Sequence, residues 1–233
     1  MAQAPTTIGF DADDTLWQNE QFFRMTQERF AELLADFADP DHLMERLLAA
    51  EKRNLGHYGF GVKGFVLSMI ETAIEVTEER VPASVIHNLL RAGQDMLQHP
   101  IHLLPHARAA IEALADGYHL LLITKGDLLD QERKLAQSGL GELFDGVEIV
   151  SHKTPAIYHE VFTRHGEGPS RALMVGNSLR SDVIPAIEAG AWGIYVPHSL
   201  TWELERADPP KGHARYHELT DLGALPDLVA ALG

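Results

Sequence analysis

The chain has 233 residues, 45% of them hydrophobic and 23% charged, a balance that excludes a disordered or fibrous protein and predicts one large domain or a domain with a substantial insertion. Its 34 acidic against 19 basic side chains give a formal net charge of -15, which disfavours nucleic acid and anionic membranes as partners. Cysteine is absent, which excludes disulfides, thiolate metal sites and a cysteine nucleophile. Any site chemistry must come from carboxylates, hydroxyls, amines or imidazoles.

The first residues, MAQAPTT, contain no basic segment followed by an apolar one. No later stretch approaches the 18 uninterrupted apolar residues that a membrane-spanning helix needs. We therefore expect a soluble, cytoplasmic protein.

Short apolar runs predict buried strands, because each is rich in Ile, Leu, Val or aromatic residues and has turn formers near its end. Between the later runs lie helical patterns that are followed by glycine. This alternation predicts right-handed crossovers and a doubly wound α/β fold with a parallel sheet. The expected strands are residues 7–10, 119–124, 146–150, 172–176 and 193–196, and the expected helices of this part are residues 105–115, 128–137, 155–165 and 179–189.

Between Thr15 and about Pro100 the sequence has helical periodicity and no convincing strand, which predicts an inserted helical bundle. We expect a core of residues 1–16 and 100–233, which carries the sheet, and a helical cap of residues 17–99. A helix is expected at 41–53, and three apolar stripes are expected to form the core of the cap. They are Phe23, Phe30, Leu34 and Phe37; Val66, Met69, Ile70, Ala73 and Ile74; and Ile86, Leu89, Leu90, Gly93, Met96 and Leu97.

Residues 56–64, GHYGFGVKG, carry four glycines between expected cap helices. Because glycine loses much conformational freedom on folding, so many glycines predict a loop that approaches a ligand closely or bends tightly. We expect Tyr58 and Phe60 of this loop, with Trp17 on the hinge side, to shape substrate specificity.

The strongest local signal is FDADDTLW, residues 10–17, directly after the first expected strand. Its three carboxylates, Asp11, Asp13 and Asp14, repel one another, and a bound cation would neutralise them. The alternative is a turn in which aspartate side chains cap backbone amides. The motif alone leaves both readings open.

Other polar residues fall where the expected strands end. Thr124 ends the second strand, Lys153 lies just past the third, and Gly-Asn-Ser at 176–178 with Asp182 follows the fourth. In a parallel doubly wound sheet these positions lie at the carboxyl edge, beside Asp11, where ligands bind such sheets. Each residue alone has an ordinary structural explanation, but together they favour a functional site.

With these residues the sequence resembles the haloacid dehalogenase-like (HAD) superfamily of hydrolases over nearly the whole chain. The first family motif, Asp-x-Asp-x-Thr, is matched by Asp11, Asp13 and Thr15, and the second, a Ser or Thr that ends a strand, by Thr124. Lys153 matches the lysine of the third motif. The fourth, Gly-Asp-Ser with a later Asp, is matched in part by 176–178 with Asp182. The helical insertion also looks like the family's type-1 cap.

The resemblance implies a Mg2+-dependent phosphatase, a phosphoric monoester hydrolase that acts on a small phosphorylated metabolite. Asp11 would attack the phosphoryl group and form an aspartyl-phosphate, and Asp13, able to carry a proton, would serve as general acid and then as general base. Thr124 and Lys153 would hold the phosphoryl oxygens. Further phosphate or substrate contacts are expected from Thr15, Lys125, Gly126, Trp17, Tyr58 and Phe60.

The expected Mg2+ ligands are Asp11, the backbone carbonyl of Asp13, Asn177 and Asp182. The family usually has a carboxylate at the position of Asn177, and an amide oxygen is neutral and a weaker ligand. Asp182 would supply the missing charge directly or through water. We expect Mg2+ to be held less tightly than in relatives with Asp at this position.

Several alternatives stay open from the sequence. True haloacid dehalogenases lack the second carboxylate, because halide departs without a proton, so Asp13 favours phosphate chemistry. Phosphonate-cleaving relatives use a cap lysine, but Lys52 and Lys63 lie in no context that indicates it. A weakly active or non-catalytic phosphate- or metal-binding protein is encouraged by Asn177 alone. A receiver domain is disfavoured because no Asp ends a second strand before Thr124. The chain is a monomer or a homodimer.

Overall fold

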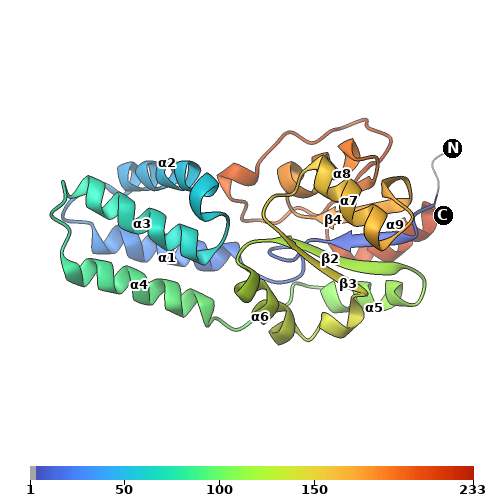
Figure 1. Ribbon diagram of the computed structural model, residues 1–233, viewed down its shortest axis with the longest axis horizontal. Helices are drawn as coiled ribbons and strands as arrows, with labels where there is room; N and C mark the ends of the chain where they lie inside the picture. The colour runs from blue at the N-terminus through green and yellow to red at the C-terminus, as the bar shows by residue number, and fades with distance from the viewer. Residues whose placement is uncertain (1–3) are drawn as a thin grey trace. The chain divides into compact units, whose positions relative to one another are not determined.

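The computed structural model describes residues 4–233, and in them six parallel strands form one sheet in the order β3-β2-β1-β4-β5-β6 (Figure 1). This confirms the predicted doubly wound α/β fold. Strand β1 is flanked by β2 and β4, so the chain reverses its direction of winding there, and ligands bind such sheets at this point. The strands are β1 (Thr7–Phe10), β2 (His119–Lys125), β3 (Gly146–Val150), β4 (Ala172–Gly176), β5 (Trp192–Tyr195) and β6 (Tyr216–Glu218).

Strand β6 was not predicted from the sequence. It has three residues and pairs with β5, with Gly193 opposite Tyr216. None of its residues is fully buried, so they give no apolar run or alternation long enough to indicate a strand.

Side chains alternate between the two faces of the sheet, as the period of two in a strand requires. Leu120 and Leu122 pack on the face that carries α5 (Ala107–Ala115) and α9 (Leu225–Ala231), whereas Leu121 and Ile123 pack on the opposite face. That second face is covered by α7 (Pro155–His165) and α8 (Ile184–Glu188).

The same alternation orients the first motif. Ile8 and Phe10 belong to the core on the α5 face, and the amide of Asp11 still bonds to Val175 O at 2.9 Å, so the backbone is paired one residue past β1. The Asp11 side chain is therefore directed to the α7 side of the sheet.

Two expected helices differ from the prediction. The helix expected at 179–189 begins with a π-helical turn, Leu179–Val183 (η3), in which the amide of Val183 bonds to Ser178 O five residues back. The helix expected from residue 105 begins at Ala107, because His106 has a left-handed backbone with φ of 66°. Helix α6 (Leu128–Ser138) follows the prediction closely.

The chain divides into two compact units, which we describe separately. The sheet unit comprises the described residues up to Glu20, Ile101–Lys125 and Gln131–Gly233. The helical unit comprises Gln21–Pro100 and Gly126–Asp130. The sequence pointed to residues 17–99 for the helical part and gave no sign that the short segment after β2 belongs with it.

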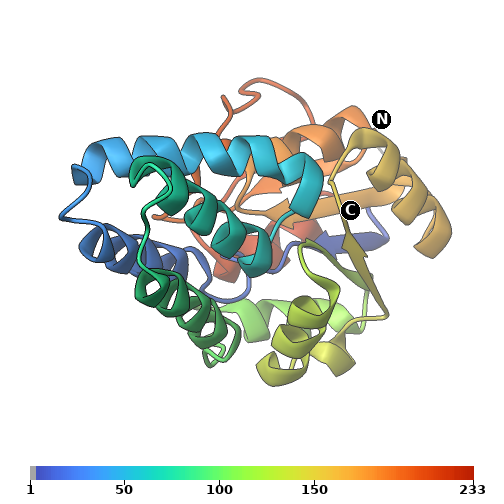
Figure 2. The same ribbon diagram turned by 60° about the vertical axis from the view of Figure 1, so that its left-hand side comes forward.

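The helical unit consists mainly of α1 (Glu20–Leu33), α2 (Pro40–Tyr58), α3 (Val62–Val76) and α4 (Ala83–Leu97), drawn from blue to green in Figure 2. The predicted stripes supply much of its core, including Phe30, Leu34, Met69 and Leu89. The prediction of burial is wrong for three stripe residues, because Phe37, Ile74 and Leu90 are 45%, 39% and 47% exposed. Among residues 4–233, no helix has both the length and the apolar stretch that crossing a bilayer requires.

The glycine-rich loop is shorter than predicted. Helix α2 continues to Tyr58 and α3 begins at Val62, so only residues 59–61 connect them. Gly56 lies inside α2, and nothing lies within 4 Å of a Cβ atom added there, so no close approach requires this glycine. Gly61, with φ of 118°, lies close to Asp127, and the Lys63 ammonium lies 3.2 Å from the Asp127 carboxylate.

Candidate active site

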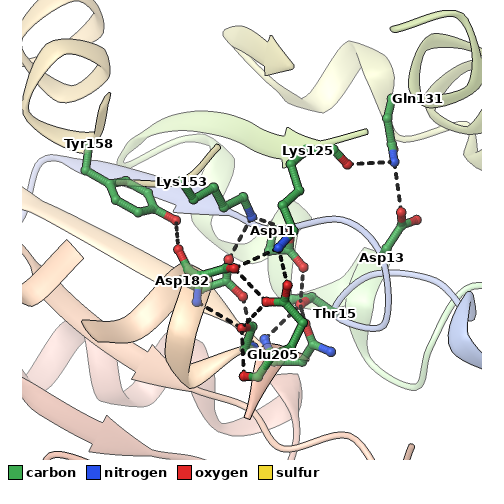
Figure 3. Close-up of polar contacts among 12 residues, drawn as sticks. Asp11, Asp13, Thr15, Lys125, Gln131, Lys153, Tyr158, Asp182 and Glu205 are labelled. Carbon is green, nitrogen blue, oxygen red and sulfur yellow. Dashed lines mark hydrogen bonds and ion pairs between the residues drawn. The ribbon is translucent and has the colours of Figure 1, made fainter. Parts of the chain in front are cut away.

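An ion-paired triad lies at the carboxyl edge of the sheet (Figure 3). The ammonium of Lys153, three residues past β3, donates to Asp11 Oδ1 at 2.5 Å and to Asp182 Oδ1 at 2.7 Å. The three side chains are 1%, 10% and 1% exposed. The structure thus brings together residues from three of the four predicted motifs, and the Asp11–Lys153 ion pair joins residues 142 apart in the chain.

This triad holds one cation between two carboxylates. Burial alone would lower the pKa of Lys153, but the charges and hydrogen bonds of Asp11 and Asp182 raise it above its usual range, so the lysine is charged. Burial and the charge of Asp11 raise the pKa of Asp182 to about 7, although Lys153 and a backbone amide act in the opposite direction. The cluster is therefore short of one positive charge.

Gly176 permits the close approach of Asp182. A Cβ atom at Gly176 would lie 2.2 Å from Asp182 Oδ2, which no side chain tolerates. The same oxygen accepts a hydrogen bond from the amide of Ser178 at 2.9 Å. The glycine of the Gly-Asn-Ser sequence is thus required for the carboxylate to fold back over the end of β4.

Thr15 connects the first motif to the fourth. Its hydroxyl donates to Asp11 Oδ2 at 3.0 Å and lies 3.3 Å from the side-chain oxygen Oδ1 of Asn177. It also accepts from the backbone N–H of Asn177 at 3.1 Å. The expected role of Thr15 in phosphate binding stays a prediction. In the structure it fixes the orientation of the Asp11 carboxylate beside Asn177.

The oxygen atoms around the triad fit a divalent cation. Asp11, Asp182 and Asn177 present carboxylate and amide oxygens, the hard donors that Mg2+ prefers, and the buried excess of negative charge favours a cation. Among residues 4–233, no three His, Asp or Glu side chains are arranged to hold a metal. The neutral amide of Asn177 and a main-chain carbonyl would therefore have to complete the ligand set.

Asp13 is turned away from this triad, toward helix α6 (Figure 3). Its Oδ1 accepts from Trp17 Nε1 at 2.7 Å and its Oδ2 accepts from Gln131 Nε2 at 2.8 Å. The ammonium of Lys134 donates to both oxygens, at 2.9 and 3.0 Å, and also to Asn19 Oδ1 at 2.9 Å.

This environment differs from the prediction that Asp13 is the carboxyl able to carry a proton. Burial would raise its pKa, but the charge of Lys134 and the hydrogen bonds from Lys134, Gln131 and Trp17 together lower it below its usual value. In this arrangement Asp13 is ionised. Trp17 was expected to contact substrate. In the structure its side chain is 0% exposed, and its indole N–H donates to Asp13.

The other predicted site residues occupy two places. Thr124 is buried near the end of β2, opposite Ile149, and Lys125 donates to Ser181 Oγ at 2.7 Å. Gly126 begins the segment that belongs to the helical unit. Tyr58 and Phe60 also lie in the helical unit, and their contact with substrate stays a prediction.

Sequence reasoning missed several residues of this network. Gln131 and Lys134 lie three apart on α6, and two polar residues on the inner face of a helix would have been the signal for them. Glu205, which pairs with Lys125, lies in an irregular segment that offers no such signal. The sequence predicts only that Tyr158 lies in a helix, α7. In the structure its hydroxyl donates to Ser181 O at 3.0 Å.

The comparisons with known proteins agree with this geometry. Residues 5–190 match the model of the haloacid dehalogenase-like hydrolases. A haloacid dehalogenase-like family hydrolase from Xanthomonas campestris is 42% identical, covers 99% of this chain and 92% of its own, and superposes with a TM-score of 0.88.

Two further comparisons are more distant. A glyceraldehyde 3-phosphate phosphatase from Methanothermobacter thermautotrophicus is 26% identical over 95% of this chain and 98% of its own. An L-2-haloacid dehalogenase from Xanthobacter autotrophicus, with chloropropionic acid covalently bound, has a TM-score of 0.69 at 18% identity over 98% and 100% of the two chains, which shows a shared fold alone. From the matching family model, the 42% identical relative and the triad at the sheet edge, the chain belongs to the haloacid dehalogenase-like hydrolases.

Proposed function

We propose that this protein is a Mg2+-dependent phosphatase that hydrolyses a small phosphorylated metabolite through an aspartyl-phosphate intermediate. The observation that carries the proposal is the arrangement of Asp11, held by Lys153 and Thr15 at the sheet edge, with a second carboxylate two residues later. A dehalogenase has no need of that second carboxylate, because halide leaves without a proton. The similarity to a glyceraldehyde 3-phosphate phosphatase supports the same class of substrate.

In the first step, a carboxylate oxygen of Asp11 attacks the phosphorus as the bond from phosphorus to the ester oxygen breaks. Lys153 stays charged and offsets the negative charge of the phosphoryl oxygens, with the Thr124 hydroxyl as a further donor. The leaving alkoxide takes a proton from Asp13. For this, Asp13 must first release Lys134, take up a proton from solvent and form a hydrogen bond to the leaving oxygen.

In the second step, water attacks the phosphorus of the aspartyl-phosphate and gives up a proton to Asp13, and the Asp11 carboxylate leaves. Inorganic phosphate departs and both aspartates return to their starting forms. Asp13 thus alternates between acid and base, and the contacts with Gln131 and Lys134 on α6 hold its ionised form before substrate binds.

Asp11, Asp182, Asn177 and the backbone carbonyl of Asp13 would hold Mg2+. When bound, the ion supplies positive charge that neutralises the phosphoryl group next to an acidic nucleophile. The excess negative charge around Lys153 supports this assignment. The donors are oxygens throughout, which suits Mg2+ and not a softer metal.

Phosphate release from a panel of phosphoesters, with Mg2+ and with EDTA, tests the proposal. The panel includes glyceraldehyde 3-phosphate, other sugar phosphates, nucleotides, flavin mononucleotide and phosphoglycolate. We expect Mg2+-dependent turnover of at least one ester, and a loss of about 1,000-fold or more in Asp11→Asn, because an amide is no nucleophile.

Asp208→Asn, an exposed aspartate of the same unit, is the matched control and should keep full activity. Phosphate release that survives Asp11→Asn or that needs no divalent ion would sink the mechanism. Chloride release from a 2-haloacid without phosphatase activity would favour a dehalogenase, and no turnover of either kind would favour a non-catalytic protein.

A further inference from the structure

Glu205 is a further acidic side chain at the site, and neither the motifs nor the proposed mechanism uses it. It ends the short turn η4 (Glu203–Glu205), which follows β5, and its side chain is 15% exposed. Figure 3 shows its carboxylate beside Asp182 and Lys125. A largely buried carboxylate needs hydrogen-bond or ion-pair partners, and these partners indicate its role.

The two oxygens of Glu205 have different partners. Oε1 pairs with the ammonium of Lys125. Oε2 accepts from the hydroxyls of Ser178 and Ser181, each at 2.6 Å. Burial would raise the pKa of Glu205, but the charge and hydrogen bond of Lys125 and the two serine hydroxyls lower it, so the side chain is ionised and accepts all three contacts.

The two serines are the sequence neighbours of two residues that would hold the metal, and lie between them in the chain. Ser178 directly follows Asn177, and Ser181 directly precedes Asp182. The backbone from Leu179 to Val183 forms the π-helical turn η3, a rare geometry that is frequent at functional sites. Ser178 Oγ also accepts from the backbone N–H of Ser181 at 2.9 Å. One carboxylate oxygen and two hydroxyls thus hold the segment from Ser178 to Ser181.

A simple ion pair with Lys125 does not account for this arrangement. Lys125 is satisfied through Oε1, and it also donates to Ser181 Oγ, whereas both serine hydroxyls converge on the other oxygen. A charge partner for Lys125 alone would need no contact with a turn that follows a different strand.

We propose that Glu205 is a positioning residue of the Mg2+ site, which acts through Ser178 and Ser181 to hold Asn177 and Asp182 in place. The inference rests on the proposed function, because it concerns the metal that the mechanism uses. It also explains how the neutral ligand Asn177 is tolerated: a weaker ligand contributes more when its position is fixed in advance.

The test is Mg2+ binding to the metal-free full-length protein, measured by isothermal titration calorimetry without substrate. Glu205→Met keeps the length of the side chain and removes both acceptors, and we expect its Mg2+ affinity to fall about tenfold. Glu205→Gln keeps an oxygen that accepts from both serines, and we expect its affinity to stay within about threefold of wild type. Glu203→Met, at an exposed position of the same turn, is the control and should bind as wild type.

A double variant, Ser178→Ala with Ser181→Ala, keeps the Glu205 carboxylate and removes the hydroxyls that it holds. We expect it to lose Mg2+ affinity as Glu205→Met does, which keeps the test decisive if Glu205→Met fails to fold. Wild-type affinity in either of these variants, or equal losses in Glu205→Gln and Glu205→Met, would overturn the inference while leaving the proposed function intact. A wild-type protein that binds no Mg2+ would contradict both.

Discussion

The triad of Asp11, Lys153 and Asp182 is costly to build and costly to break. Breaking a buried ion pair by removal of one partner costs about 3–5 kcal/mol, because the remaining charge is left without compensation. Here two carboxylates share a single ammonium, and burial together with the charge of Asp11 raises the pKa of Asp182 to about 7. At the scale of single residues, the site is therefore set up for a further cation.

Replacement of Asn177 by aspartate tests this balance. Asn177→Asp adds a charged ligand beside Thr15 and Asp11, and we expect Mg2+ to bind about tenfold more tightly, or about 1.4 kcal/mol. Without metal, a third carboxylate increases repulsion, so the melting temperature should fall and should recover when Mg2+ is added. Calorimetric titration and thermal unfolding measure the two effects.

Asn88→Asp on α4 makes the same change of charge in the helical unit and serves as the control. It should leave Mg2+ affinity unchanged. If Asn177→Asp binds Mg2+ no better than wild type, Asn177 is not a ligand.

At the scale of elements, α3 packs closely against α4 at a glycine, Gly93, which has no side chain. A Cβ atom at Gly93 of α4 would lie 2.5 Å from Val66 Cγ2 of α3. Val66 is 8% exposed and β-branched, so it has little freedom to move away. Gly56 of α2 is the opposite case, because nothing lies within 4 Å of its added Cβ.

These two glycines predict opposite effects of the same substitution. Gly93→Ala should lower the free energy of unfolding by about 1–2 kcal/mol, since overpacking outweighs the gain in helix propensity. Gly56→Ala should raise it by about 0.5–1 kcal/mol, since alanine restricts the unfolded chain and clashes with nothing. Urea unfolding followed by circular dichroism measures both. An equal rise in the free energy of unfolding of both variants would mean that Val66 moves aside at no cost.

At the scale of the whole molecule, the net charge of -15 opposes the binding of an anionic substrate. The proposed site resolves this locally, since Lys153 and Mg2+ supply positive charge at one edge of the sheet while the rest of the chain stays acidic. Bound metal should then stabilise the folded protein, because the unfolded chain has no such site.

We expect Mg2+ at about 100 times its dissociation constant to stabilise the protein by about 2.7 kcal/mol, which corresponds to about 5–10 °C in melting temperature for a chain of this size. Differential scanning fluorimetry over a series of Mg2+ concentrations checks this. NaCl at matched ionic strength screens the surface charge without filling the site. An equal shift with NaCl would attribute the effect to screening.

Much of the fold followed from local pattern. Apolar runs such as residues 172–176 gave five of the six strands to within about a residue, because the strands of a sheet covered by helices are rich in apolar residues. Strand β6 escaped because an edge strand of three residues has no such constraint. Helix ends were less certain, as at His106, because local backbone geometry decides them.

The sequence by itself indicated that Asp11, Lys153 and Asp182 would meet, because the carboxyl ends of parallel strands share one edge. Only the tertiary structure decided how the charges pair. Asp13 meets Lys134 across 121 residues and Lys125 meets Glu205 across 80. These partners are chosen by desolvation and distance in the folded chain, where burial makes an unpaired charge costly, and no local periodicity records that cost.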